Sequence, residues 1–325
     1  MTKFVLIMFT AIAVVISLLF IQLLGVQYEN GAVLAENYEY HIQILTSNAS
    51  SYHSSRLREG AYASMEKNGV YAEFVTAAHL DISNLGKFID MAVSAQVDGV
   101  AIQPVDIDET GSLIKAAQDK GLVVTNYESG LNLIPGIPTV GSNYTNTGFL
   151  GGEIAVDAVG GDSEAVVILS GSSLDPDTQQ QQNLIVKGIA DAAAHVENFK
   201  ISGVEFVNNQ LFEAEDVMVE LLSRESPPDA IICLDEKSTP AIAQTLVDHS
   251  RVGDVQIVGF GSMPQTVDYI RRGVIYGAVC PDSFETGYEI VKQQKNIIEG
   301  KEVDEYISLK LYRIDKSNYA QYQET

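Results

Sequence analysis

The 325-residue sequence contains no tryptophan and only two cysteines, Cys233 and Cys280. Both cysteines end apolar, strand-like runs, and the sequence leaves open whether they pair. A core of this size needs no disulfide, and a buried cysteine behaves as a small hydrophobic residue. We therefore expect two free, buried thiols.

Basic residues are scarce: 20 Lys and Arg stand against 43 Asp and Glu, giving a net charge of -23. Such a chain repels phosphate backbones and anionic lipid surfaces. We therefore expect no nucleic-acid partner.

Local motifs for catalysis are also missing. The histidines are scattered, and none lies four residues from another with a carboxylate between them, as a zinc hydrolase would require. The sequence has neither GxSxG nor GxxxxGK[ST], and Gly259–Met263 (GFGSM) supplies only two glycines of a dinucleotide-binding pattern. We expect no enzymatic activity, no cofactor and no metal.

A long apolar run, Phe4–Val26, follows Lys3, the one basic residue before it. About 20 apolar residues span a bilayer, whereas a cleaved signal has an apolar region of about 7–15. The length favours a retained anchor after a cytoplasmic start (1–3), with a linker (27–40) leading to a body on the extracytoplasmic face of the bacterial cell membrane. Cleavage after Ala35, which would secrete the body, and a buried core helix are the alternatives.

From His41 onward, short β-branched runs alternate with helical patterns, which predicts parallel sheets with crossover helices. Leu57, Ala61 and Met65 form one apolar helix face that ends at Gly69. The length predicts two lobes with separate cores. The expected strands are HIQILT, VYAEFV, DGVAIQ, LVVTNY, EAVVIL, ISGVEFV, DAIICL, VQIVGF, YGAVC and ISLKLY.

Four blocks between Ile42 and Tyr312 resemble the sugar-binding periplasmic family that includes ribose- and galactose-binding proteins. They are DGVAIQPVD (Asp98–Asp106), GLVVTNYES (Gly121–Ser129), VGSNYTNTGFLGGE (Val140–Glu153) and VQIVGFGSMP (Val255–Pro264). The order and spacing of the four blocks carry the resemblance.

The resemblance implies the type I periplasmic binding protein fold: two doubly wound parallel α/β lobes, a short multi-strand hinge and a cleft between the lobes. It divides the chain into an N-terminal lobe (41–142 plus about 281–303) and a C-terminal lobe (143–280 plus about 304–325). Within the second lobe, Gly151 and Gly152 are expected to let a helix pack closely on a strand.

Ligands of open parallel sheets bind outside the carboxyl ends of the strands, and a sugar needs carboxylates, amides and aromatic faces. Carried over block by block, the resemblance gives these ligand-binding candidates: Ser47, Ser51, Tyr52, His53, Gln103, Glu128 and Asp235. The alternatives are an exposed helix-start histidine at His53, turn or capping chemistry at Ser47 and Ser51, and solvated strand ends elsewhere.

Three positions depart from the family pattern. Ile185 stands where an arginine is usual, Gly261 where an aspartate is usual, and Pro281 where a glutamine is usual. Each unmade buried hydrogen bond costs about 1–3 kcal/mol, so either the ligand differs or the cleft has drifted. A one-residue shift would let other side chains substitute: Asn183, Ser262 or Asp282.

The predicted function is capture of a small polar ligand, a sugar or sugar derivative, by lobe closure about hinge strands near Ser142, Val279 and Val303. The closed form would dock on a membrane partner, either a sugar transport permease or a sensor kinase, and a retained anchor favours sensing. The alternatives are a ligand-free docking module, a repressor-type ligand-sensing core and an enzyme on the same fold. A repressor would need a DNA-reading domain where the apolar run stands. The family resemblance implies a monomeric body.

Overall fold

The computed structural model describes residues 38–46, 51–77, 81–104, 107–127, 134–170, 176–207 and 211–322. Within these ranges no helix is long and apolar enough to cross a membrane. The apolar run 4–26 and two of the candidate residues, Ser47 and Glu128, lie outside the described residues.

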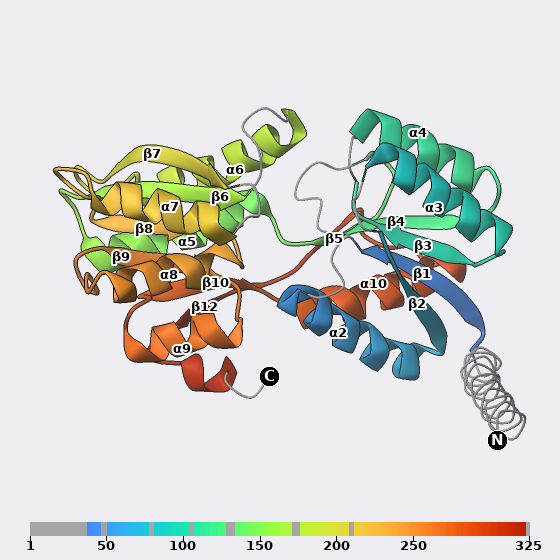
Figure 1. Ribbon diagram of the computed structural model, residues 1–325. Helices are drawn as coiled ribbons and strands as arrows, with labels where there is room; N and C mark the ends of the chain where they lie inside the picture. The colour runs from blue at the N-terminus through green and yellow to red at the C-terminus, as the bar shows by residue number, and fades with distance from the viewer. Residues whose placement is uncertain are drawn as a thin grey trace, which may run out of the picture.

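The strands of the described residues form two six-stranded sheets with equivalent connectivity (Figure 1). The first sheet, in spatial order, consists of β11 (Tyr306–Ser308), β5 (Thr139–Gly141), β4 (Val123–Tyr127), β3 (Gly99–Ile102), β1 (Tyr40–Thr46) and β2 (Val70–Thr76). The second consists of β12 (Leu311–Asp315), β10 (Gly277–Pro281), β9 (Gln256–Phe260), β8 (Ala230–Cys233), β6 (Glu164–Ser170) and β7 (Lys200–Val207). Neighbouring strands are parallel, except that β12 runs antiparallel to β10. The prediction of two doubly wound lobes is confirmed.

Helices cover both faces of each sheet (Figure 1), and each face has its own apolar cluster. On the first sheet, one face carries α2 (Tyr52–Asn68) and α10 (Ser283–Ile298), and the other carries α3 (Ile82–Ser94) and α4 (Ile107–Gln118). On the second, one face carries α5 (Tyr144–Val159) and α6 (Pro176–Ala193), and the other carries α7 (Leu211–Leu222), α8 (Ser238–Asp248) and α9 (Pro264–Arg272). A short 3₁₀ helix, η1 (Tyr319–Tyr322), follows β12.

The helix predicted from Leu57, Ala61 and Met65 is α2, and all three side chains are buried. The hydroxyl of Ser51 caps its first turn, and Gly69 ends it in the left-handed conformation. Since α2 is the helix that follows β1, it begins at the carboxyl edge of the first sheet.

The Gly151–Gly152 pair packs differently from the prediction. A Cβ added at Gly151 would meet the side chains of Ile232 on β8 and of Leu234 just after it at ordinary distance, as expected for a helix on a strand. At Gly152, however, an added Cβ would lie 2.8 Å from the Cβ of Ala192 on α6. The second glycine therefore brings two helices together, because it lies on the side of α5 that faces α6.

The segment ISLKLY, predicted as one strand, belongs to two sheets. Tyr306–Ser308 pairs with β5 of the first sheet, whereas Leu311–Asp315 pairs with β10 of the second. The chain therefore crosses between the lobes after Ser308, beyond the boundary expected near Val303. Alternating apolar and polar residues suit either pairing, so the pattern did not show the break. The three-residue strand β5 was not among the predicted strands.

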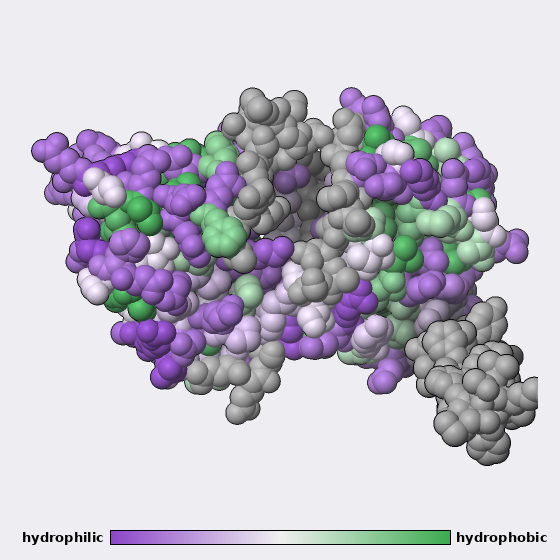
Figure 2. All heavy atoms as spheres, viewed as in Figure 1, coloured by the Kyte–Doolittle hydropathy of each residue, from purple (hydrophilic) through white to green (hydrophobic). Residues whose placement is uncertain are grey.

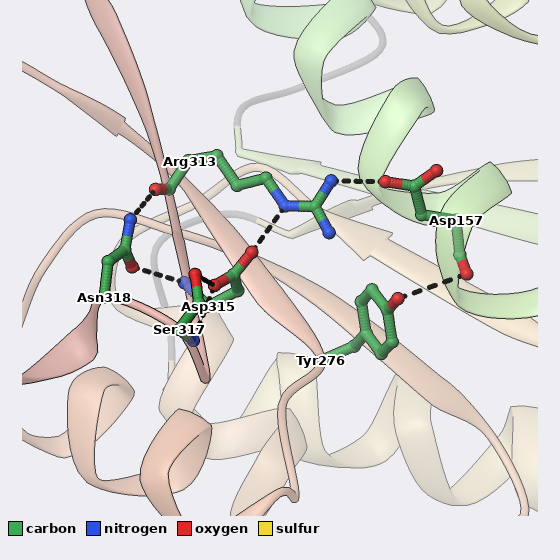
Figure 3. A network of polar contacts seen from close by, with 6 residues as sticks. All are labelled: Asp157, Tyr276, Arg313, Asp315, Ser317 and Asn318. Atoms are coloured by element: carbon green, nitrogen blue, oxygen red, sulfur yellow. Dashed lines mark hydrogen bonds and ion pairs between the residues drawn. The ribbon is translucent and has the colours of Figure 1, made fainter.

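A polar network ties β12 to the end of α5 in the second lobe (Figure 3). Arg313 contacts the carboxylates of Asp157 and Asp315, and the hydroxyl of Tyr276 donates to the carbonyl of Asp157 at 3.2 Å. Asp315 pairs with Gly277, at the beginning of β10. The network thus fixes the edge strand at the end of the sheet remote from the carboxyl ends of the parallel strands.

Candidate functional site

A cavity of about 370 Å³ lies between the two lobes, where the carboxyl ends of both sheets meet. The space-filling view shows the molecule hollowed between the lobes (Figure 2). This volume falls in the range of about 300–1,000 Å³ that is typical of small-molecule sites.

The N-terminal lobe lines the cavity with the starts of two helices and one strand end. Tyr52 and His53 open α2, Gln103 follows β3, and Ser283 opens α10. The Nδ1 atom of His53 lies 2.6 Å from the hydroxyl oxygen of Ser283. This hydrogen bond joins the first turns of α2 and α10 at the cavity wall.

Ser51 also lines the cavity, and its hydroxyl caps the first turn of α2. Its Oγ accepts the Ser54 backbone N–H at 3.0 Å and donates to the Ser54 hydroxyl at 2.9 Å. In this structure Ser51 therefore acts as a helix cap, which is one of the two roles that the sequence left open.

The C-terminal lobe contributes the loops after β8 and β9. One carboxylate oxygen of Asp235 accepts the Ser238 backbone N–H at 2.7 Å, at the start of α8. The hydroxyl of Thr239 donates to the Asp235 carbonyl at 2.7 Å and accepts the Phe260 N–H at 3.0 Å. These bonds hold the two loops together at the rim of the second sheet.

Glu236 reaches from this wall toward the N-terminal lobe. The backbone of His53, at the start of α2, lies beside its carboxylate and favours the charged form. Burial raises the pKa of Glu236, and the neighbouring His53 opposes that rise. Glu236 is therefore a half-buried carboxylate that contacts both lobes.

Three aromatic side chains, Tyr52, Tyr144 and Phe260, join these polar groups around the cavity. Hydroxyls, an amide, carboxylates and aromatic faces together suit a ligand that is polar at its rim and apolar on a ring face. Closure around such a ligand would exclude water and strengthen each hydrogen bond.

Residues 42–302 match the pattern of a protein family described as "Periplasmic binding protein domain". The chain belongs to this family. The role of this chain is solute binding. Membership of the family implies that the chain is located outside the cytoplasm.

Several proteins are similar to this periplasmic binding protein. A putative rhizopine-binding protein of Rhizobium meliloti is 26% identical over 253 residues, which cover 75% of this chain and 79% of the relative. A solute-binding protein of an ABC transporter from Burkholderia graminis C4D1M, solved with D-arabinose, has a TM-score of 0.78 at 20% identity, covering 89% of this chain and 99% of that one. A chain of the XylFII-LytSN complex has a TM-score of 0.75 at 23% identity, covering 86% and 98%.

The structure gathers five of the predicted site residues of this binding protein around one cavity: Ser51, Tyr52, His53, Gln103 and Asp235. The other two, Ser47 and Glu128, lie outside the described residues.

Sequence reasoning missed several residues that line the same cavity. Glu236 is adjacent to Asp235, Phe260 ends a predicted strand, and Tyr144 lies within a block that carried the family resemblance. Ser283 follows the strand end at Pro281, so the strand-end rule applied at β10 would have found it.

The three departures from the family pattern, Ile185, Gly261 and Pro281, all line the cavity of this binding protein. Of the substitutes considered, only Ser262 lines the cavity as well. The other two do not: Asn183 is exposed, and the side chain of Asp282 accepts the Glu285 N–H at 2.9 Å to cap α10.

The two cysteines of this binding protein are free and buried, as expected. Burial raises the pKa of Cys233 to about 12 and that of Cys280, at the cavity wall, to about 11. Both are protonated at neutral pH and therefore poor nucleophiles. In the part of the chain that the structure describes, no cluster of three or more His, Cys, Asp or Glu side chains could hold a metal ion.

Proposed function

We propose that this protein captures a sugar or sugar derivative in the cleft between its lobes and presents it to a membrane partner without chemical change. The observation that carries the proposal is the composition of the cavity wall. Carboxylates, an amide, hydroxyls and aromatic side chains converge on one volume from both lobes. The solved neighbour in complex with D-arabinose supports the same ligand class.

Ligand capture would act by shifting the population of lobe arrangements. Three connections join the lobes: the chain crosses from β5 to α5, from β10 to α10 and from β11 to β12. A ligand that contacts both walls has more contacts in the closed arrangement and stabilises it.

We propose further that the body is held at the extracytoplasmic membrane surface by the run 4–26, and that it is monomeric. The partner is a sugar transport permease or the outer part of a sensor protein. Similarity to a chain solved in the XylFII-LytSN complex supports partnership with another protein through the same fold.

The test is thermal unfolding of the full chain in mild detergent against pentoses, hexoses, inositols and their amino, acidic and phosphorylated forms. A ligand that binds only the folded state must raise the midpoint. We expect one sugar-like compound to raise it, and the rise to be lost in Gln103→Ala. If the chain is folded and no compound moves the midpoint, the sugar-receptor proposal is wrong and a ligand-free docking module remains.

A further inference from the structure

Glu236 lies next to Gly261, the position at which the family usually has an aspartate. Gly261 has a φ of +79°, and a Cβ built on it would lie 3.2 Å from both Cγ and Oε1 of Glu236. A side chain at position 261 would therefore compete with Glu236 for the same volume. The carboxylate comes instead from the loop after β8.

The contacts of Glu236 hold its charge at the cavity. The backbone of His53 favours its charged form, as expected for a carboxylate beside the positive end of α2 in the opposite lobe. In the described part of the chain, no Lys or Arg forms an ion pair with it. The charges of His53 and Lys237 also favour its charged form, and Glu236 lines the cavity that a ligand would enter.

Building on the proposed function, we infer that Glu236 determines ligand specificity by charge. It accepts hydrogen bonds from the hydroxyl or amino groups of a polyhydroxy ring and rejects ligands that carry an acid. The ligand is therefore a neutral or amino-substituted sugar or cyclitol, and not a uronic acid or a sugar phosphate.

The charges around the cavity support this selection. Among the described residues that line it, two carry carboxylates, Asp235 and Glu236, and one is a lysine, Lys237. A carboxylate can only accept hydrogen bonds, so an ionised acid facing it would place two negative charges side by side in a partly desolvated space. Burial raises the pKa of Glu236, as expected for a carboxylate in a partly desolvated position. The net charge of -23 also disfavours the approach of anions.

The experiment compares matched ligands on the full chain in mild detergent. For whichever neutral sugar or cyclitol raises the unfolding midpoint, calorimetry gives Kd values for that compound, its amino derivative and its acid derivative. The parent chain should bind the acid at least about tenfold more weakly than the neutral compound. Glu236→Gln keeps the side-chain shape and removes the charge. In this variant the ratio of the Kd for the acid to the Kd for the neutral compound should shrink at least about threefold.

Two further variants keep the outcome interpretable. Glu225→Gln makes the same change in net charge at an exposed position, and it should leave the ratio unchanged. Glu236→Asp keeps the charge and should keep the preference order. A folded Glu236→Gln chain with the parental ratio would overturn the inference while leaving the proposed function intact. Failure of every neutral, amino and acidic compound to bind the parent would overturn the proposed function and this inference together.

Discussion

Residues near the strand ends of this protein both cap the following helix and line the cavity. Ser51 and Asp235 each line the cavity, and each satisfies a backbone N–H at the start of a helix. The unpaired N–H groups of a first helical turn need such acceptors. A polar residue at this place in the sequence therefore does not by itself distinguish capping from ligand binding.

At the same scale, Glu236 makes folding depend on pH. Because burial raises its pKa above the ordinary 4.5, the folded chain binds that proton more tightly than the unfolded chain does. Its stabilising contribution is present at low pH and is lost as pH rises through the raised pKa. His53 and Lys237 reduce the shift, and Asp235 adds to it.

We therefore expect the free energy of unfolding of the parent, minus that of Glu236→Gln, to decrease between about pH 5 and about pH 8. Urea denaturation of both chains at each pH measures this difference, and taking the difference cancels the other carboxylates. A difference that increases with pH would show that Glu236 is stabilised in its charged form.

The buried thiols give a second prediction at the residue scale. With pKa values of about 12 for Cys233 and about 11 for Cys280, neither should react appreciably with a disulfide reagent in the folded chain near pH 8. Both should react at once in guanidinium chloride, which serves as the control. Rapid labelling of Cys280 in the folded chain would mean that the cavity wall opens far enough to ionise it.

At the scale of elements, the described part of each lobe contains a helix pair in backbone contact. A Cβ at Gly148 on α5 would lie 1.9 Å from the carbonyl oxygen of Ile185 on α6, and one at Gly188 would lie 2.0 Å from that of Thr145. In the other lobe, a Cβ at Gly60 on α2 would lie 1.8 Å from the carbonyl oxygen of Phe284 on α10. Because α2, α5 and α10 all begin at the cavity, these contacts also set the position of its walls.

Gly148→Ala should lower the free energy of unfolding by about 1–3 kcal/mol or more, because rigid backbone would have to move. Gly86→Ala is the matched control. Its added Cβ would meet nothing closer than the Leu113 side chain at 3.7 Å, so helix propensity should raise stability by up to about 1 kcal/mol. Guanidinium denaturation measures both, and shifts of equal sign and size would show that close helix contact does not require the glycine.

At the scale of the whole molecule, excess negative charge opposes compactness. The net charge of -23 on 325 residues is distributed over both lobes, and long-range repulsion falls as salt shortens the Debye length. The ion pairs between the described residues are mostly exposed ones, each of which contributes little.

Raising sodium chloride from about 20 mM to about 300 mM should therefore raise the thermal midpoint of the full chain. Calorimetry measures the shift, and choline chloride should give the same result if screening is the cause. A midpoint that falls with both salts would show that attractive pairs outweigh the repulsion.

The sequence by itself determined the alternation of strands and helices, the two lobes and most of one cavity wall. Apolar periodicity is a local property, so α2 could be predicted from Leu57, Ala61 and Met65. The strand-end rule is also local once the strands are known. The family resemblance selected Gln103 and Asp235 at such strand ends, and the structure brings both to the same cavity.

Only the tertiary structure decided how these pieces meet. The split of ISLKLY between two sheets depends on which strand edges are unpaired, which no short segment encodes. Likewise, the position of Glu236 depends on the space left by Gly261, which has no side chain, and on the start of α2 in the other lobe. Such pairings join residues far apart in the chain, so they depend on the packing of whole lobes.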